Sequence, residues 1–176
     1  MKVRRVATGQ TADGKSVVVS DEQLEPITVS LLPGAEYHVV WGSDTPVTLP
    51  ASGHQPVARS WFPLPGGFRF IFVRFPAFSF STATDPPSEA ALAEYREKLP
   101  GLGEVMEPDN PGMHSSDTVD FVYIISGEIW LELDDGAEVR VGAGDCVVQN
   151  GTRHAWRNKS AEPCLAAAAL VAAVRT

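Results

Sequence analysis

Short apolar runs separated by glycine and proline restrict this chain to a fold of strands and turns. Its 176 residues include 15 glycines and 14 prolines, which fall between the apolar runs and do not gather in one linker. The runs are rich in β-branched and aromatic residues and too short for helices, a pattern typical of strands. In the first half the sequence predicts strands over residues 17–19, 27–32, 37–41, 57–62 and 68–75.

One segment predicts a helix instead. Ser88 is a suitable N-cap for residues 89–99, which are rich in alanine and place Leu92, Tyr95 and Leu99 on one stripe. Pro100-Gly101 then ends the helix. We expect a surface helix that connects two β regions.

The β pattern is strongest from residue 121 onward. FVYIIS ends at Gly127, EIWLEL alternates polar and apolar residues, and turn residues separate the shorter runs EVRV, CVVQ and HAWR. Strands at such regular spacing indicate a barrel or sandwich. The last apolar run, residues 165–174, is alanine-rich, which favours a helix, but its place after a series of strands favours a closing strand. We expect the strand.

Alternation along 128–133 assigns each side chain to a face of its strand. The two glutamates face outward, which leaves Ile129, Leu131 and Leu133 to fill the interior. Trp130 then shares the outer face. We expect the N-terminal extension or another subunit to cover its indole.

Charge and cysteine content exclude several classes of function. Lys and Arg number 14 against 22 Asp and Glu, so the net charge is −8, which argues against nucleic-acid and anionic-membrane partners. Two cysteines, Cys146 and Cys164, are too few for a disulfide framework. The longest apolar run is half the length of a membrane-spanning helix. We expect a soluble, cytoplasmic protein.

Histidines mark the candidate site. His114 begins the segment HSSDTVD, in which Ser116 and Asp120 share its face if the segment is extended, and His154 lies in the later run HAWRN. We expect His114, Asp120 and His154 to converge inside a barrel if their strands are neighbours. Of the other two histidines, we expect His54 to be exposed in a loop, and His38 to be interior or at a sheet edge.

Two motifs in this region resemble those of the cupin superfamily of small β-barrels. The first has the form G-x5-H-x-H-x3,4-E-x6-G and corresponds here to His114, Ser116, Asp120 and Gly127. The second has the form G-x5-P-x-G-x2-H-x3-N and corresponds to Gly144, Gln149, Gly151, His154 and Asn158. The resemblance implies an all-β, jelly-roll-like cupin barrel with an N-terminal strand-rich extension and one short helix. We expect a single domain over 1–176, with the extension and helix in 1–101 and the barrel core in 102–176.

Three positions depart from the motifs. Ser116 replaces a histidine, Asp120 replaces a glutamate and Gln149 replaces a proline. The resemblance therefore implies a reduced metal site, in which His114, Asp120 and His154 hold a divalent ion such as Fe, Mn, Ni or Zn with no organic cofactor. Ser116 would orient a metal-bound water.

Alternation also predicts the rest of the pocket. If Asp120 points inward, Val122 and Ile124 do too, and Trp156 shares the face of His154. These apolar side chains around a few polar groups suit a small-molecule ligand, although Val122 and Ile124 also fit an ordinary barrel core.

The sequence supports three functions. The first is a metal-dependent dioxygenase, decarboxylase or isomerase acting on a small organic molecule. The second is a metal-free, non-catalytic small-molecule-binding or sensory cupin. The third is metal-independent isomerisation, with a histidine and Asp120 as base and orienting group. We also expect a homodimer, formed where the N-terminal strands add to a partner's sheet.

Overall fold

Ten strands and one α-helix form the part of the chain that the computed structural model describes, residues 1–79 and 87–176. The strands are β1 (Val3–Gln10), β2 (Ser16–Leu24), β3 (Glu36–Ser43), β4 (Phe68–Phe75), β5 (Thr118–Ser126), β6 (Glu128–Glu132), β7 (Glu138–Gly142), β8 (Cys146–Asn150), β9 (Ala155–Arg157) and β10 (Cys164–Ala172). Helix α1 spans Glu89–Lys98, and two short 3₁₀ turns, η1 and η2, cover Gly103–Val105 and Asp134–Gly136. The all-β prediction is confirmed.

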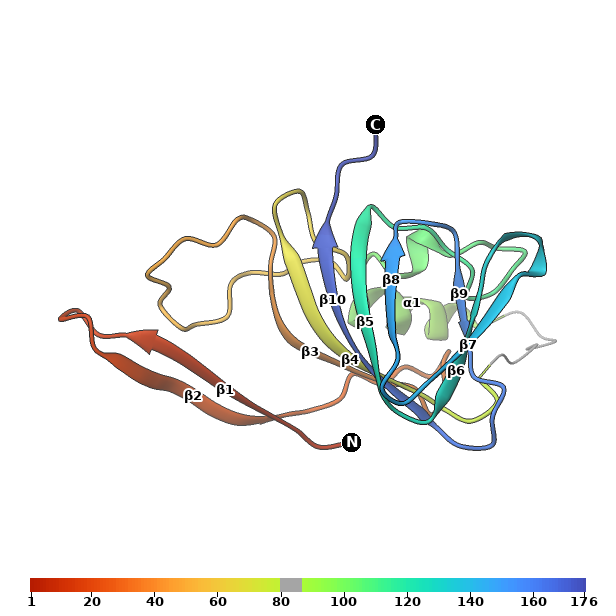
Figure 1. The fold of residues 1–176 in the computed structure, drawn as a ribbon, viewed down its shortest axis with the longest axis horizontal. Coiled ribbons are helices and arrows are strands. Elements are labelled where there is room, and N and C mark those ends of the chain that lie inside the picture. Colours follow the sequence, from red (N-terminus) through yellow and green to blue (C-terminus); the bar gives the residue numbers. More distant parts are fainter. Residues whose placement is uncertain (80–86) are drawn as a thin grey trace.

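Two antiparallel sheets enclose the barrel interior (Figure 1). One has five strands in the order β3-β4-β10-β5-β8, and the other has three in the order β7-β6-β9. Because β10 pairs with β4 on one side and β5 on the other, strands from both halves of the sequence share one sheet. The region before residue 102 thus supplies β3 and β4 to the barrel.

The N-terminal hairpin stands apart from the barrel. Strands β1 and β2 pair only with each other among the described strands, and the hairpin extends away from the barrel beyond β3 (Figure 1). Ion pairs from Arg4 to Asp21 and from Arg5 to Glu22 join its strands. The strand predictions missed β1 because charged and polar residues interrupt its apolar pattern.

Two of the predicted strands, residues 27–32 and 57–62, are wrong. Residues 27–32 form turns, with Ile27 alone making a bridge to Tyr37, and residues 57–62 form an irregular loop. Both runs are apolar because they pack on the core: Val29 and Trp61 are buried, and the Trp61 ring meets Tyr37 edge-on at 5.3 Å between centroids. Burial alone, without a pairing partner, does not make a strand.

A buried arginine fixes the loop before β4. The Arg69 guanidinium donates to the carbonyls of Ser43, Phe68 and Ser60 and pairs with the Asp44 carboxylate. Its side chain is only 2% exposed, so these bonds compensate a charge that water cannot reach. The bonds hold the backbone two residues before Phe62, which lines the candidate site.

The helix prediction is confirmed. The Ser88 hydroxyl accepts a hydrogen bond from the Ala91 amide, and the helix ends at Lys98, one residue before the predicted end. Tyr95 and Leu99 are buried on the predicted stripe. No helix within 1–79 and 87–176 is long and apolar enough to cross a membrane.

The alternation in β5 and β6 is largely as predicted. Ile129 and Leu131 are buried, while Leu133 is only half-buried. Trp130 faces outward, but its cover differs from our expectation: the Arg140 guanidinium of β7 lies 6.0 Å from its ring centroid. The alanine-rich segment is the strand β10, as expected.

Candidate functional site

The two motif histidines lie side by side. His114 precedes β5 and His154 precedes β9, and the two residues form an antiparallel bridge with N···O distances of 2.9 Å in both directions. Their rings are 4.4 Å apart between centroids. His154 is 1% exposed and His114 is half-buried. The structure thus brings together two of the three residues predicted to bind metal.

Backbone carbonyls set the tautomer of both imidazoles. Nδ1 of His114 lies 3.1 Å from the Gly112 carbonyl oxygen, and Nδ1 of His154 lies 2.9 Å from that of Thr152. A carbonyl oxygen only accepts, so each Nδ1 carries the proton and donates it. Each Nε2 therefore keeps its lone pair for a ligand.

Both imidazoles are neutral at physiological pH. Burial lowers the pKa of His114, and burial together with the neighbouring His114 lowers the pKa of His154 to about 4. The pair therefore presents two uncharged bases at adjacent positions.

The turn that carries His154 explains the glutamine at the motif's proline position. The Gln149 side-chain amide donates to the Thr152 carbonyl at 3.0 Å and to its hydroxyl at 2.6 Å. The same Thr152 carbonyl holds His154, so Gln149 stabilises the backbone that orients the imidazole. Gly151 has a φ of +61°, and a Cβ there would lie 2.9 Å from the Ser116 carbonyl oxygen. The hydrogen bonds of Gln149 and the positive φ of Gly151 thus define the turn that positions His154.

Asp120 points into the barrel from β5, as predicted. It is 7% exposed, and its Oδ1 has no hydrogen-bond partner within the described part of the chain. Burial raises the pKa of Asp120 to about 6, while a hydrogen bond from the Thr118 hydroxyl opposes the rise. A carboxyl group with this pKa is partly protonated near neutral pH.

Ser116 is buried at the start of the segment that leads into β5. Its hydroxyl lies 2.8 Å from that of Thr118, which in turn bonds Asp120, so the three side chains form a row of polar groups along one face. Ser116 also lines a pocket at the surface. The row thus connects that pocket with the buried carboxyl group.

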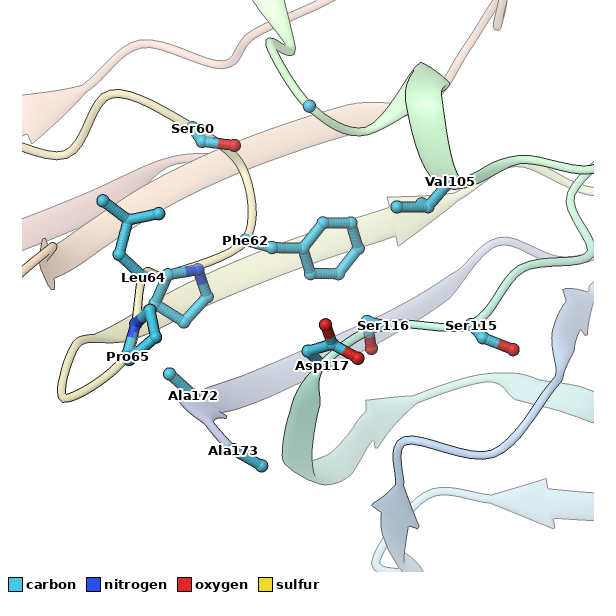
Figure 2. Close-up of a pocket in the computed structure, with 12 residues that line it drawn as sticks. Ser60, Phe62, Leu64, Pro65, Val105, Ser115, Ser116, Asp117, Ala172 and Ala173 are labelled. Carbon is cyan, nitrogen blue, oxygen red and sulfur yellow. The ribbon is translucent and has the colours of Figure 1, made fainter. Parts of the chain in front are cut away.

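The pocket has a volume of about 350 Å³, and its lining includes Phe62, Ser115 and Ser116 but neither histidine. Figure 2 shows the Phe62 ring in the pocket, across from Ser115 and Ser116. The same ring lies 6.2 Å from His114 between centroids, so Phe62 borders both the pocket and the imidazoles. Sequence reasoning missed this residue, since it lies far from the motifs in a segment predicted as a strand.

The predicted pocket residues occupy two settings. Trp156 is half-buried, 6.0 Å from His154 between centroids and 6.5 Å from Phe75. Val122 and Ile124 belong to the buried hydrophobic core, with exposures of 8% and 0%. Trp156 is thus the one that borders an imidazole ring.

Two of the three predicted metal ligands lie together, and the third is not grouped with them among the described residues. Among the described residues, no three His, Cys, Asp or Glu side chains are grouped so that they can hold a metal ion. The two Nε2 atoms suit two coordination positions, but Asp120 is not grouped with them and Ser116 is bonded to Thr118. A metal held by His114, Asp120 and His154 stays a prediction.

The remaining motif residues are structural. Asn158 is fully buried, donates to the Glu162 carbonyl and accepts from the amide and hydroxyl of Ser160.

His38 is buried and His54 is exposed, as expected. Cys164 is buried, and Cys146 is exposed.

The chain is similar to known proteins in sequence and in fold. Residues 103–171, which contain both histidines, match the family model described as Cupin domain. The chain also superposes on the Cnp3 cupin domain of Schizosaccharomyces pombe with a TM-score of 0.50, over 98% of this chain and 89% of that one, at 9% identity. The chain has the fold of a cupin β-barrel, and residues 103–171 are similar to the Cupin domain family.

Two curated relatives of this chain are named for biosynthesis clusters. Oryzines biosynthesis cluster protein J of Aspergillus oryzae is 35% identical over 100 residues, which are 49% of this chain and 56% of that protein. Phomopsin biosynthesis cluster protein C' of Diaporthe leptostromiformis is 44% identical over 48 residues, which are 27% and 25% of the two chains. The match spans about half the length of the first relative and a quarter of the second.

Proposed function

We propose that this protein binds a small organic molecule beside the His114–His154 pair and catalyses a proton transfer on it. The observation that carries the proposal is the free Nε2 on two adjacent neutral imidazoles. The neighbouring pocket of about 350 Å³ suits a small ligand. The two relatives named for biosynthesis clusters support a role on a small biosynthetic intermediate.

The protein's own groups are sufficient for an isomerisation. One imidazole Nε2 takes a proton from a carbon next to a carbonyl, and the C–H electron pair moves into that carbonyl. The imidazolium then returns the proton to a neighbouring atom, so no oxidant or reductant is needed. In this proposal the acid form of Asp120, whose pKa is about 6, acts on the enolate oxygen through the hydroxyls of Thr118 and Ser116, of which Ser116 lines the pocket.

A metal-dependent reaction is the second candidate, and one observation favours it. Histidine ligands usually donate their other ring N–H to a carbonyl or carboxylate, as both histidines do here. Such a site would use His114 and His154 with Asp120, and the ion would be Fe, Mn, Ni or Zn. Because the described donors do not form that three-residue group, we derive no step through a metal.

A proton-exchange experiment separates these readings. We would screen aromatic and keto acids by thermal shift and follow each binder's exchangeable C–H proton in D2O by ¹H NMR. The expected result is exchange catalysed by the wild-type protein, slowed at least 100-fold in His154→Gln and unchanged in His54→Gln, a matched variant of an exposed histidine.

Other outcomes contradict the proposal. Binding without exchange assigns the chain to the non-catalytic binders. Near-stoichiometric Fe, Mn, Ni or Zn in protein purified without chelator, lost in His154→Ala together with exchange, assigns the reaction to the metal-dependent class.

A further inference from the structure

Residues 107–112 form a loop whose backbone orients His114. The loop follows Met106, which faces His114 in an isolated antiparallel bridge. The carbonyl oxygen of Gly112, at the end of the loop, lies 3.1 Å from Nδ1 of His114. Because this bond keeps the proton on Nδ1 and the lone pair on Nε2, the position of Gly112 determines the tautomer of His114. We call residues 107–112 the Gly112 loop.

An arginine of β9 holds the tip of the Gly112 loop. The Arg157 guanidinium donates from Nη2 to the Asn110 side-chain oxygen at 2.9 Å and from Nη1 to the Pro111 carbonyl. Its Nε donates to the Glu132 carboxylate of β6 at 2.6 Å. The Arg157 side chain is only 13% exposed, so water competes little for these charge-assisted bonds. One guanidinium therefore fastens the loop to the three-stranded sheet.

Gly112 itself packs against this guanidinium. Its φ is +85°, and a Cβ at this position would lie 3.0 Å from Nη1 of Arg157. A residue without a side chain lets the guanidinium approach the backbone closely. Arg157 thus contacts the loop at the residue whose carbonyl binds His114.

The two imidazoles have separate supports. Arg157 bonds to the Gly112 loop, which holds Nδ1 of His114. Gln149 bonds to Thr152, whose carbonyl holds Nδ1 of His154. Loss of one support should therefore change the tautomer of one ring, whereas a general loosening of the barrel would change both.

We infer that Arg157 is a positioning residue for His114, which keeps Nε2 of that imidazole free by holding the Gly112 loop in place. Its consequence for catalysis rests on the proposed function, in which an imidazole Nε2 takes the substrate proton. The effect on the tautomer does not, because it is a property of the protein without substrate. The two can therefore fail separately.

Long-range ¹H–¹⁵N NMR of protein labelled with ¹⁵N-histidine tests the inference, at about pH 8, where imidazole is neutral. In wild type both rings should carry the proton on Nδ1. Arg157→Met keeps the apolar stem and loses the donors, so the ratio of the Nδ1–H to the Nε2–H tautomer of His114 should fall about five-fold, the effect of one lost hydrogen bond. The ratio for His154 should stay unchanged. Gln149→Ala should give the opposite result, a change at His154 alone.

Arg140→Met is the matched control. Arg140 lies on β7 of the same sheet and pairs with Glu128, and its side chain is 64% exposed. This variant should leave both rings as in wild type. Single His→Gln variants assign the signals, and circular dichroism with thermal unfolding checks that each variant is folded.

The Arg157→Met variant retains a second attachment of the loop. Arg153 donates twice to the Glu107 carboxylate at the start of the loop, at 2.6 Å each, so we expect the variant to fold. If it does not, Asn110→Ala removes one acceptor of Arg157 and leaves the Arg157–Glu132 pair, and it should change the His114 ratio in the same direction.

Two results would overturn the inference. One is a His114 tautomer that stays unchanged in the folded Arg157→Met variant, or in Asn110→Ala if that variant is used. The other is an equal change in both rings, which would show a general loosening. A change at His114 alone supports the positioning role even if wild type catalyses no proton exchange, in which case only the proposed reaction fails.

Discussion

Replacing Asp120 with asparagine should stabilise the protein at alkaline pH and not at acid pH. Asparagine has nearly the same shape but cannot ionise. The carboxyl group is 7% exposed and has an unpaired Oδ1, so its ionised form is poorly solvated. We expect the substitution to remove this unfavourable charge.

The magnitude follows from the pKa of Asp120, which rises from 3.8 to about 6 on folding. In the folded state the carboxyl group binds its proton more tightly, so its contribution to stability is fully present below about pH 4 and is lost as the pH rises through 6. The complete loss is about 3 kcal/mol, of which about 2 kcal/mol falls between pH 4.5 and 8.

The assay is urea unfolding of wild type and Asp120→Asn at pH 4.5 and pH 8. The free energy of unfolding of the variant minus that of wild type should be about 2 kcal/mol larger at pH 8 than at pH 4.5, which corresponds to a rise in Tm of about 4–8 °C. An unsatisfied amide N–H would lower stability equally at both pH values, so the difference isolates the carboxylate.

Asp117→Asn is the matched control, since Asp117 is exposed on the same segment and pairs with Arg175. It should change stability by less than about 1 kcal/mol, without this dependence on pH. If Asp120→Asn differs from wild type by the same amount at both pH values, the carboxyl group is not destabilised by burial and its role as an acid near neutral pH fails with it.

Three further predictions concern the motif residues. Wild type should lose stability as the pH falls from 6.5 to 4, because the His154 imidazole takes up a proton in the unfolded chain while the buried imidazole, with its pKa of about 4, stays neutral. His154→Gln should lose about 2–3 kcal/mol less between pH 7 and 4.5, and equal losses by urea unfolding would contradict the lowered pKa. Gln149→Ala should lower the free energy of unfolding by about 1–3 kcal/mol and weaken ligand binding in calorimetry, because two hydrogen bonds to Thr152 are lost. Unchanged stability and affinity would show that Gln149 does not stabilise the turn that carries His154. Gly127→Ala should lower the free energy of unfolding by more than about 3 kcal/mol, because the new Cβ would lie 2.4 Å from a carbonyl oxygen. Gly144→Ala should lower it by about 1–2 kcal/mol, because only the positive φ opposes a side chain there. Similar decreases in Tm for the two variants would refute the clash at Gly127.

The second half of the fold was predictable from the sequence because its strands are both alternating and locally paired. Strand β5 turns at Gly127 into β6, and β6 pairs with β7, so pattern and turn chemistry agree there. In the first half, apolar residues serve different purposes. Residues 57–62 are apolar because Trp61 is buried, but their backbone is held by Arg69, not by a neighbouring strand. Strand β1 depends on pairing with β2 and shows little pattern of its own.

The sequence predicted the candidate site only where the spacing of the motifs indicates which residues lie close together in space. The spacing placed His114 and His154 on neighbouring segments, and their side chains meet. Phe62 was missed because the chain returns to the site through a loop without periodicity. The role of Gln149 was missed because its hydrogen bonds to Thr152 depend on the side-chain geometry of a turn, which a motif position does not specify.

The central position of β10 determines the order in which this chain can fold during synthesis. Strands β4 and β5 are separated by more than forty residues, and β10 is the strand that joins them. The pairs β3–β4 and β5–β8 therefore cannot combine into one sheet until residues 164–172 have left the ribosome. Until then their edges and aromatic rings stay accessible to other chains. Protein made with a stop codon before residue 164 should therefore aggregate, not accumulate as a folded intermediate.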